Sequence, residues 1–324
     1  LNWTWLVNDV VVASDTQLLD GSYFDKNDSV QATVQPADDE TLGQTVASSE
    51  LVILNSPPAI TSVTLTPSEV YESSTITCTP GGWTDADSDP EGYTYAWEVS
   101  GTVISETTAT LDGTHFSRDD TVACTVTPDD GDNTGEPKTS DAITVENSAP
   151  SITTATLSTT TPREGDTLTV TIDGAADDDG DTISYTYAWY VGSTTVATTE
   201  ELTDTDFAKG DSIYVEVTPT DGTDAGVAVT SDTATVANTA PVLDSATLTP
   251  DPVAYSGTLT CTPGTVSDID GDTLTYAYSW SVNTTSVTAT TSTIDSASFS
   301  EGASVFCTLT PNDGEENGSP VDSN

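Results

Sequence analysis

Residues 93–99 read Tyr93-Thr94-Tyr95-Ala96-Trp97-Glu98-Val99 and lie between Cys78 and Cys124 in a chain of 324 residues. The large apolar residues fall at every second position, which is the pattern of a β-strand with one buried face. The order Cys–Trp–Cys, with the cysteines 46 positions apart, is that of an immunoglobulin-type sandwich. The stretch therefore predicts a two-sheet β-sandwich around Trp97.

This stretch recurs along the chain at a fixed interval. The tryptophans that mark it are 92, 92 and 91 residues apart, at Trp5, Trp97, Trp189 and Trp280. A second series keeps nearly the same spacing, at Phe24, Phe116, Phe207 and Phe299. The segment Asn-Ser-Pro-Pro at 55–58 returns in related form at 147–150 and 238–241. Self-similarity of this kind indicates tandem domains.

We therefore predict four repeats: a partial Ig-like repeat at 1–54 that starts at its third strand, Ig-like domains at 55–146 and 147–237, and one at 238–324 without its last strand. Helix-forming runs are missing, Thr and Val dominate, and Gly, Pro, Asn and Asp mark the turns. The fold class is all-β: tandem Ig-like Greek-key β-sandwich domains of about 92 residues each, expected to form an elongated array.

The four cysteines support this fold. Cys261 and Cys307 are again 46 residues apart, with Trp280 between them, whereas the third repeat has Val170 and Val215 at the equivalent positions. Paired replacement by apolar residues predicts disulfides Cys78–Cys124 and Cys261–Cys307, with two buried thiols per domain as the alternative. Disulfides indicate export through an oxidising compartment, to the extracellular space or the cell surface.

Several motifs together carry a family resemblance. N-[ST]-A-P linkers, D-x-D-G-D loops, Y-x-Y-x-W strands and T-P-x-D-G segments resemble the tandem Ig-like repeats of large secreted bacterial surface proteins, and are similar in style to cadherin-like and polycystic-kidney-disease-type modules. The resemblance covers essentially the whole chain and implies an adhesin, a stalk or a non-catalytic spacer. Val122 and Val305 stand where antibody domains have a tyrosine, so no tyrosine corner is expected.

The charge of the chain excludes several partners. Fifty-three acidic and five basic residues give a formal net charge of −48, and the basic residues form no contiguous cluster: Lys26, Arg118, Lys138, Arg163 and Lys209. Nucleic acid and anionic membrane surfaces are therefore unlikely partners. No apolar run is long enough to insert into a membrane. So much acid opposes compaction unless cations, salt or spacing offset it.

Many of the acidic residues lie in two loops of each repeat. Aspartates at alternate positions precede each Trp strand, and a second acidic turn follows each strand that holds the second cysteine or its equivalent. Since Ca²⁺ prefers six to eight oxygen ligands, we predict structural Ca²⁺ held by Asp85, Asp87, Asp89, Asp130, Asp177, Asp179, Asp181, Asp221, Asp268, Asp270, Asp272 and Asp313. In an Ig sandwich both loops lie at the pole where the linker enters, so the bound ion would stiffen the junction. Because Lys is scarce, few cations would compete with the ion for these carboxylates. Solvated Asp-rich turns and adaptation to high salt remain alternatives.

Catalytic residues are not predicted. The only histidine, His115, has no counterpart in the other repeats, so neither a catalytic triad nor a zinc site has its usual components. Trp83 is another singleton, beside the acidic loop of the second repeat. It is a candidate ligand contact for a sugar or a protein, or else a cap on the pole of the domain.

The predicted function is that of a non-catalytic structural segment of a secreted or cell-surface stalk or adhesin-type protein, with calcium at the junctions and the neighbouring Ig-like domains of the same chain as partners. Two alternatives stay open: a subunit of a self-assembling extracellular filament or sheath, with identical subunits as partners, and a glycan- or protein-binding module that uses the pole loops. The incomplete terminal repeats predict a segment of a longer array, or strands supplied by another subunit.

Overall fold

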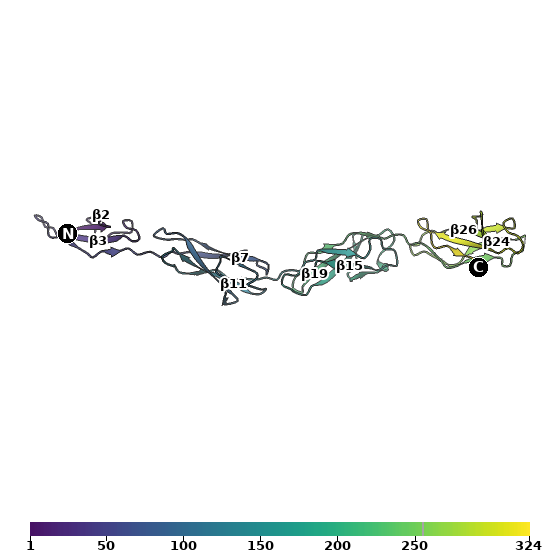
Figure 1. The fold of residues 1–324 in the computed structure, drawn as a ribbon, viewed down its shortest axis with the longest axis horizontal. Coiled ribbons are helices and arrows are strands. Elements are labelled where there is room, and N and C mark those ends of the chain that lie inside the picture. The colour runs from purple at the N-terminus through teal and green to yellow at the C-terminus, as the bar shows by residue number, and fades with distance from the viewer. Residues whose placement is uncertain (255) are drawn as a thin grey trace. The chain divides into compact units, whose positions relative to one another are not determined.

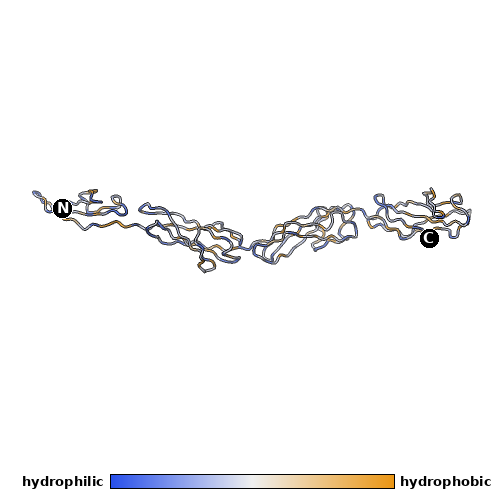
Figure 2. The backbone as a smooth tube through the Cα atoms, viewed as in Figure 1, coloured by the Kyte–Doolittle hydropathy of each residue, from blue (hydrophilic) through white to orange (hydrophobic). Residues whose placement is uncertain are grey.

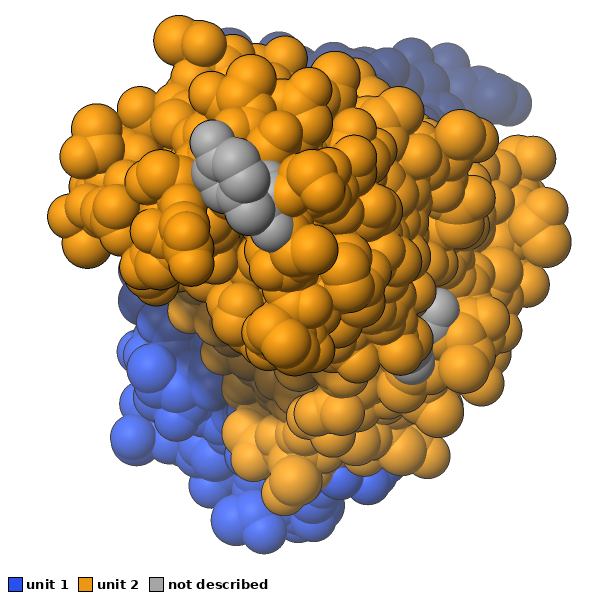
Figure 3. Space-filling model, turned by 90° about the vertical axis from the view of Figure 1, so that its right-hand side faces the viewer, with its two compact units in different colours: residues 1–148 blue, residues 149–324 orange. Residues whose placement is uncertain are grey.

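The computed structural model describes residues 1–254 and 256–324, which form antiparallel β-strands joined by turns, with one short helical turn, η1 (Asp204–Asp206) (Figure 1). The chain divides into two compact units, residues 1–148 and 149–324 (Figure 3). Within the described residues, no helix has the length and apolarity that crossing a membrane requires. The predicted all-β fold class is confirmed.

The first unit begins with a single sheet formed by the first repeat. The strand order is β2-β1-β3-β4, and β5 also pairs with β3. The strands are β1 (Asn2–Val7), β2 (Val10–Ser14), β3 (Ser29–Gln35), β4 (Val46–Ala47) and β5 (Leu51–Val52). Only one sheet is present among the residues described here, and large apolar side chains such as Leu18 and Val46 are exposed.

The second repeat, also in the first unit, is a two-sheet sandwich. Its sheets have the orders β10-β7-β6 and β12-β11-β8-β9, with β13 also paired to β11, which is the arrangement of an immunoglobulin-type Greek key. The strands are β6 (Ser62–Thr66), β7 (Thr75–Gly81), β8 (Gly92–Val99), β9 (Thr102–Val103), β10 (Thr110–Asp112), β11 (Thr121–Asp129), β12 (Lys138–Thr139) and β13 (Ile143–Thr144).

The second unit contains two further sandwiches. In the third repeat, the sheet β14-β15-β18 faces the sheet β17-β16-β19-β20, with β21 paired to β19. Its strands are β14 (Thr154–Leu157), β15 (Leu168–Asp173), β16 (Ser184–Val191), β17 (Thr194–Ala197), β18 (Glu201–Leu202), β19 (Ser212–Thr220), β20 (Val229–Thr230) and β21 (Ala234–Thr235).

The fourth repeat pairs the sheet β23-β24-β28 with the sheet β27-β26-β29-β30, and β22 pairs with β25 beside them. Its strands are β22 (Val242–Leu243), β23 (Ala246–Thr249), β24 (Thr258–Pro263), β25 (Val266–Ser267), β26 (Thr275–Val282), β27 (Thr285–Val287), β28 (Thr293–Asp295), β29 (Val305–Asn312) and β30 (Val321–Asp322).

Alternation along the strands builds the cores. In β11, Val122, Cys124 and Val126 are fully buried, whereas Ala123 and Thr125 between them are partly exposed. Figure 2 shows the same interleaving of hydrophobic and hydrophilic residues along the chain. Each sandwich can therefore close over a core although only 35% of the residues are hydrophobic.

Both predicted disulfides are confirmed. Cys78 in β7 is bonded to Cys124 in β11, and Cys261 in β24 to Cys307 in β29, with Cα–Cα distances of 6.3 and 6.4 Å. Each bond joins the two sheets of its sandwich. In the third repeat, Val215 is fully buried and Val170 packs against the same core, so this domain fills the position without a covalent link.

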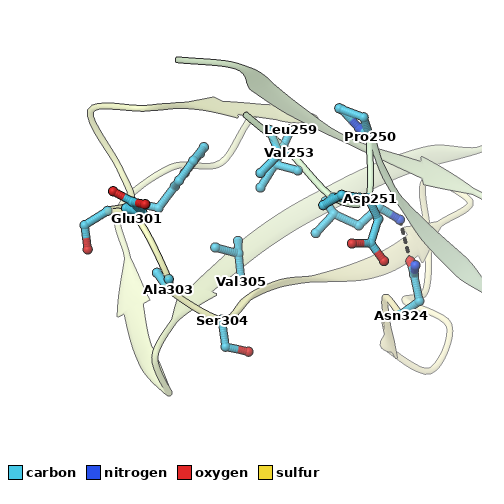
Figure 4. A pocket seen from close by; sticks show the side chains of 14 residues that line it. Pro250, Asp251, Val253, Leu259, Glu301, Ala303, Ser304, Val305 and Asn324 are labelled. Carbon is cyan, nitrogen blue, oxygen red and sulfur yellow. Dashed lines mark hydrogen bonds between the residues drawn. The ribbon is translucent and has the colours of Figure 1, made fainter. Parts of the chain in front are cut away.

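A pocket of 360 Å³ opens in the fourth repeat and is lined by apolar side chains such as Val253, Leu259 and Val305 (Figure 4). Val253 corresponds to Val70 of the second repeat, which forms a bridge with the fully buried Val145. When the second and fourth repeats are aligned, the pocket in the fourth repeat therefore lies at the position that Val145 fills in the second. Asn324 borders it and accepts a hydrogen bond from the backbone N–H of Leu248 through its Oδ1.

Candidate cation sites at the domain junctions

Two acidic loops meet at one pole of each complete sandwich. In the second repeat the loop between β7 and β8, here called the B–C loop, holds Asp85, Asp87 and Asp89, and the loop between β11 and β12, the F–G loop, holds Asp130. The two loops are neighbours because β8 pairs with β11 up to the register Gly92↔Asp129. Equivalent pairs join β16 to β19 and β26 to β29. The predicted juxtaposition of the two loops is thus present in three repeats.

The first aspartate of each B–C loop holds the loop in shape. Asp85 Oδ1 accepts the backbone N–H groups of Asp87 and Asp89 at 2.8 and 3.1 Å. Asp177 Oδ1 accepts the N–H groups two and four residues ahead of it, and Asp268 Oδ1 accepts the one four residues ahead. These hydrogen bonds explain why aspartate is the first residue of each B–C loop, since its side chain accepts backbone N–H groups two or four residues ahead.

The second oxygen of the same aspartates has no partner. Asp85 Oδ2, Asp177 Oδ2 and Asp268 Oδ2 are buried and make no hydrogen bond. Three further buried side-chain atoms lack a partner in the described part of the chain, namely Asn55 Oδ1, Thr239 Oγ1 and Asp270 Oδ1. All six belong to the linkers and B–C loops of the junctions. Five of the six can only accept, so a cation would satisfy them where another acceptor could not.

The carboxylates also converge in space. One oxygen from each member of three groups lies within 4.8 Å of the others, and the groups are Asp85, Asp89 and Asp130; Asp177, Asp179 and Asp181; and Asp268, Asp270 and Asp272. Two oxygens on opposite sides of a calcium ion are about 4.8 Å apart, because each Ca–O distance is ~2.4 Å. The spacing of the three groups therefore fits a hard cation.

The predicted ligands in the F–G loop are already occupied by hydrogen bonds, from their own loop or from the linker. Asp313 is almost fully buried, and its Oδ1 accepts the backbone N–H groups of Glu315 and Glu316 at 2.7 Å. Hydrogen bonds from the Asn238 side chain and from the backbone of Glu316 lower the pKa of Asp313 to about 2. Asp130 has the same surroundings in the second repeat, and its pKa is likewise lowered. Asp221 Oδ1 accepts the N–H groups of Thr223 and Asp224.

The acidic loops also bind the linker that enters the domain. Asn55 Nδ2 donates to Asp130 Oδ2, and Asn238 Nδ2 donates to Asp313 Oδ2, both at 2.8 Å. The next backbone N–H, of Ser56 or Thr239, donates to Asp87 or Asp270 at 2.6 Å. Asn55 and Asn238 therefore tie the linker to the F–G loop of the domain that it enters. The recurrence of this asparagine was visible in the sequence, but the recurrence did not indicate its acceptor.

A glycine of each F–G loop packs directly on the linker. A Cβ added to Gly135, Gly226 or Gly318 would lie 1.8, 1.8 or 2.0 Å from the carbonyl oxygen of the linker proline of the same domain. Those prolines are Pro58, Pro150 and Pro241, and all are buried. Only glycine allows this approach. These glycines lie four positions after the glycine of each T-P-x-D-G segment, and nothing in the sequence indicated this contact.

The basic residues correct a sequence-based expectation. The scarcity of Lys was expected to leave the acidic loops without a competing protein cation. Instead, Lys26 Nζ lies 2.6 Å from Asp89 Oδ2 and 2.7 Å from Asp132 Oδ2, and Lys209 Nζ lies 2.6 Å from Asp272 Oδ2. These carboxylates raise the pKa of both lysines. Aligning the repeats on their phenylalanines shows that a basic residue recurs two positions later, at Lys26, Arg118 and Lys209, but it does not show the acceptors.

Trp83 lies at the same pole of the second repeat. It is partly buried and packs against the hydrophobic core. Its ring meets that of Tyr93 edge to face, with the centroids 5.5 Å apart. Trp83 therefore covers part of the hydrophobic core at this pole. His115 is exposed on the turn after β10.

Comparison with known proteins gives structural neighbours only. No protein-family model matches the chain, and no curated protein matches it. Similar solved structures include a Ca²⁺-stabilised, ice-binding adhesin of an Antarctic bacterium, with 17% identity over 99% of this chain and 88% of the adhesin chain, at a TM-score of 0.30.

Two further similar structures are tandem-domain segments of other proteins. The FN1–FN3 domains of chicken CNTN1 are 13% identical over 82% of this chain and 98% of theirs, with a TM-score of 0.27. Immunoglobulin domains 1–5 of Sidekick-1 are 12% identical over 99% of this chain and 72% of theirs, with a TM-score of 0.29. At such scores the fold assignment rests on the strand topology described above.

Proposed function

We propose that this chain is a non-catalytic structural segment of a secreted or cell-surface protein, in which Ca²⁺ bound at the acidic loops stiffens the junctions between successive Ig-like domains. The two intradomain disulfides support an oxidising location. The stalk or adhesin role extends this proposal to the whole protein. Glycan binding and filament assembly remain alternatives without a specific contact to favour them.

The observation that carries the proposal is the set of buried acceptors without partners. A buried carboxylate oxygen that makes no hydrogen bond is costly, and the cost is met when a cation binds to it. This oxygen recurs at Asp85, Asp177 and Asp268, the first aspartate of three B–C loops. The same unpartnered oxygen at the same position of three repeats supports one kind of ligand for all three.

Solvated turns explain the loops less well. The hydrogen bonds of Asp130, Asp313, Asp87 and Asp270 to the linker account for one oxygen of each of these side chains. They leave Asp85 Oδ2 and Asp268 Oδ2 buried and away from water. Adaptation to high salt would spread acid over exposed surfaces and would not require these buried oxygens. Ca²⁺ with a dissociation constant of about 10⁻⁴ M, within the range of extracellular modules, would meet the need.

The test uses the whole chain in buffer with excess EGTA and in 10 mM CaCl₂. Ions bound per chain are counted by equilibrium dialysis, and thermal unfolding is followed by calorimetry. We expect three ions per chain, one for each carboxylate group. At a ligand concentration 100 times the dissociation constant, each site adds about 2.7 kcal/mol to the stability of its domain.

The decisive variant changes Asp85→Asn, Asp177→Asn and Asp268→Asn together. Asparagine keeps the oxygen that holds the loop and replaces the unpartnered oxygen by a donor, so calcium binding and the calcium-dependent rise in Tm should disappear while the fold in EGTA is kept. Asp141→Asn with Asp232→Asn, at exposed equivalent positions away from the loops, is the matched control. Equal melting of the native chain in EGTA and in CaCl₂ would refute the proposal.

A further inference from the structure

The basic residues are not distributed at random over the repeats. Three of the five in the chain follow the phenylalanine of their repeat by two positions: Lys26, Arg118 and Lys209. The fourth repeat has Glu301 there. In both units, the lysine of one repeat reaches the acidic loops of the next repeat.

In the first unit, Lys26 bridges both acidic loops of the second repeat. Its Nζ donates to Asp89 Oδ2 in the B–C loop and to Asp132 Oδ2 in the F–G loop. The side chains of Lys26 and Asp89 are only 18% and 19% exposed. This pair is therefore better shielded from salt than an ordinary surface salt bridge.

In the second unit, Lys209 makes the equivalent contacts and uses every proton of its ammonium group. Its Nζ lies 2.6 Å from Asp272 Oδ2 in the B–C loop, 2.8 Å from Glu315 Oε1 in the F–G loop and 2.7 Å from Asn238 Oδ1 in the linker. An ammonium group has three donors and no acceptor. The three oxygens around Nζ therefore match the three donors of the ammonium group.

The backbone places these basic residues. The N–H of Lys209 donates to Glu164 Oε1, and the N–H of Arg118 donates to Glu72 Oε1, in each case within the same repeat. The residue that follows is also anchored, since the N–H of Asn27, Asp119 or Gly210 donates to a carbonyl at the end of its own repeat. The basic side chain is thus directed from a fixed turn, which reduces the entropy lost when it binds.

Asp89 and Asp272 belong to two sets of contacts at once. Each bonds to a lysine ammonium, and each is also a member of a carboxylate group that fits a metal ion. We infer that the junction between the first and second repeats and the junction between the third and fourth repeats are each built for two cations, one taken from solution and one supplied by the protein as the lysine of the preceding repeat. This inference rests on the proposed function for the first cation only.

The lysine would therefore limit how many ions a junction binds. Without it, Asp272, Glu315 and Asn238 would present three oxygens to solvent, two of them charged, next to the first site. A second divalent ion could then enter, because the ligands that Ca²⁺ prefers would be present and the competing positive charge would be gone. Asp89 and Asp132 give the same expectation at the junction in the first unit.

The experiment counts calcium bound to the full chain by equilibrium dialysis at low ionic strength. Lys209→Met keeps the length and the apolar stem of the side chain, and we expect it to bind one ion more than the native chain. Lys26→Met should also add one ion, and the double variant two. Lys209→Gln provides a second neutral side chain and should give the same increase, with near-UV circular dichroism as the check on folding.

Two controls separate charge from position. Lys138→Met removes the same charge from exposed strand β12 and should leave the number of ions unchanged. Lys209→Arg keeps the charge and should also leave it unchanged. If Lys209→Met, Lys209→Gln and Lys26→Met bind no more calcium than the native chain, the inference is wrong.

The two proposals fail separately. The number of ions on the native chain tests the proposed function, and the difference between variant and native chain tests the inference. A native chain that binds no calcium, together with a Lys209→Met variant that binds one ion, would overturn the first and support the second.

Discussion

The cores of the domains and their junction poles follow different rules. A disulfide occupies the centre of the second repeat, and Val170 and Val215 occupy the same place in the third. At the pole, by contrast, the linker asparagine, the first aspartate of the B–C loop and the glycine of the F–G loop are the same residue in all three complete poles.

The difference reflects what each region must satisfy. A core position needs an apolar group of suitable volume, and several side chains provide that. A buried polar position needs a donor or acceptor at a fixed point, and a wrong partner leaves a charged oxygen unpaired. Substitutions in the two regions should therefore have different consequences, and three predictions test this.

The largest effect is expected from loss of a disulfide. Cys78→Val with Cys124→Val copies the third repeat into the second and should lower the free energy of unfolding of that domain by about 4 kcal/mol, the loop-closure term for a loop of this length. The domain should still fold, because valines fill the same place in the third repeat. Urea unfolding measures the change, and reduced native protein is the control. A variant that does not fold would contradict the tolerance of the core.

A smaller effect is expected when the linker contact is crowded. Gly318→Ala places a Cβ 2.0 Å from the Pro241 carbonyl oxygen, so the linker or the F–G loop must shift. We expect a loss of about 1–3 kcal/mol, as for other overpacked sites, in thermal unfolding of the fourth repeat. Gly21→Ala is the control, because no atom lies within 4 Å of its added Cβ. Equal stability of the two variants would show that the pole adapts as the core does.

The smallest effect concerns a single hydrogen bond at the pole. The pKa of Asp313 is about 2 in the folded chain against an ordinary value of 3.8, so its contribution to stability is complete above pH 3.8 and is lost as the pH falls towards 2. Asn238→Ala removes the largest cause, and the pKa should rise towards 3.8, which flattens the loss of stability in this range.

Carboxyl resonances followed by NMR during an acid titration measure this pKa directly. Ser245→Ala serves as the control, since it changes a side-chain donor to Asp244 outside the junction. An unchanged pKa of Asp313 in Asn238→Ala would show that the backbone N–H groups of Glu315 and Glu316 alone hold the carboxylate ionised.

Much of the fold could be predicted from the sequence, and less of the site. The alternation in residues 93–99 and the paired exchange of cysteine for valine are local or repeated patterns, and they predicted the strands and the disulfides correctly. The acidic loops were also recognised. The roles of Asn55 and Lys26 were missed because their acceptors are distant in the sequence. The acceptor of Asn55 lies 75 residues ahead, and the two acceptors of Lys26 lie 63 and 106 residues ahead.

The sequence by itself determined that the chain repeats, that its strands bury one face, and that acid gathers in two loops of each repeat, because periodicity and turn preference are written residue by residue. Only the tertiary structure decided which carboxylates bind the linker, which bind a lysine and which keep a buried oxygen without a hydrogen-bond partner. That division depends on where the two loops, the linker and the turn of the preceding repeat meet, and such contacts between distant residues leave no local pattern in the sequence.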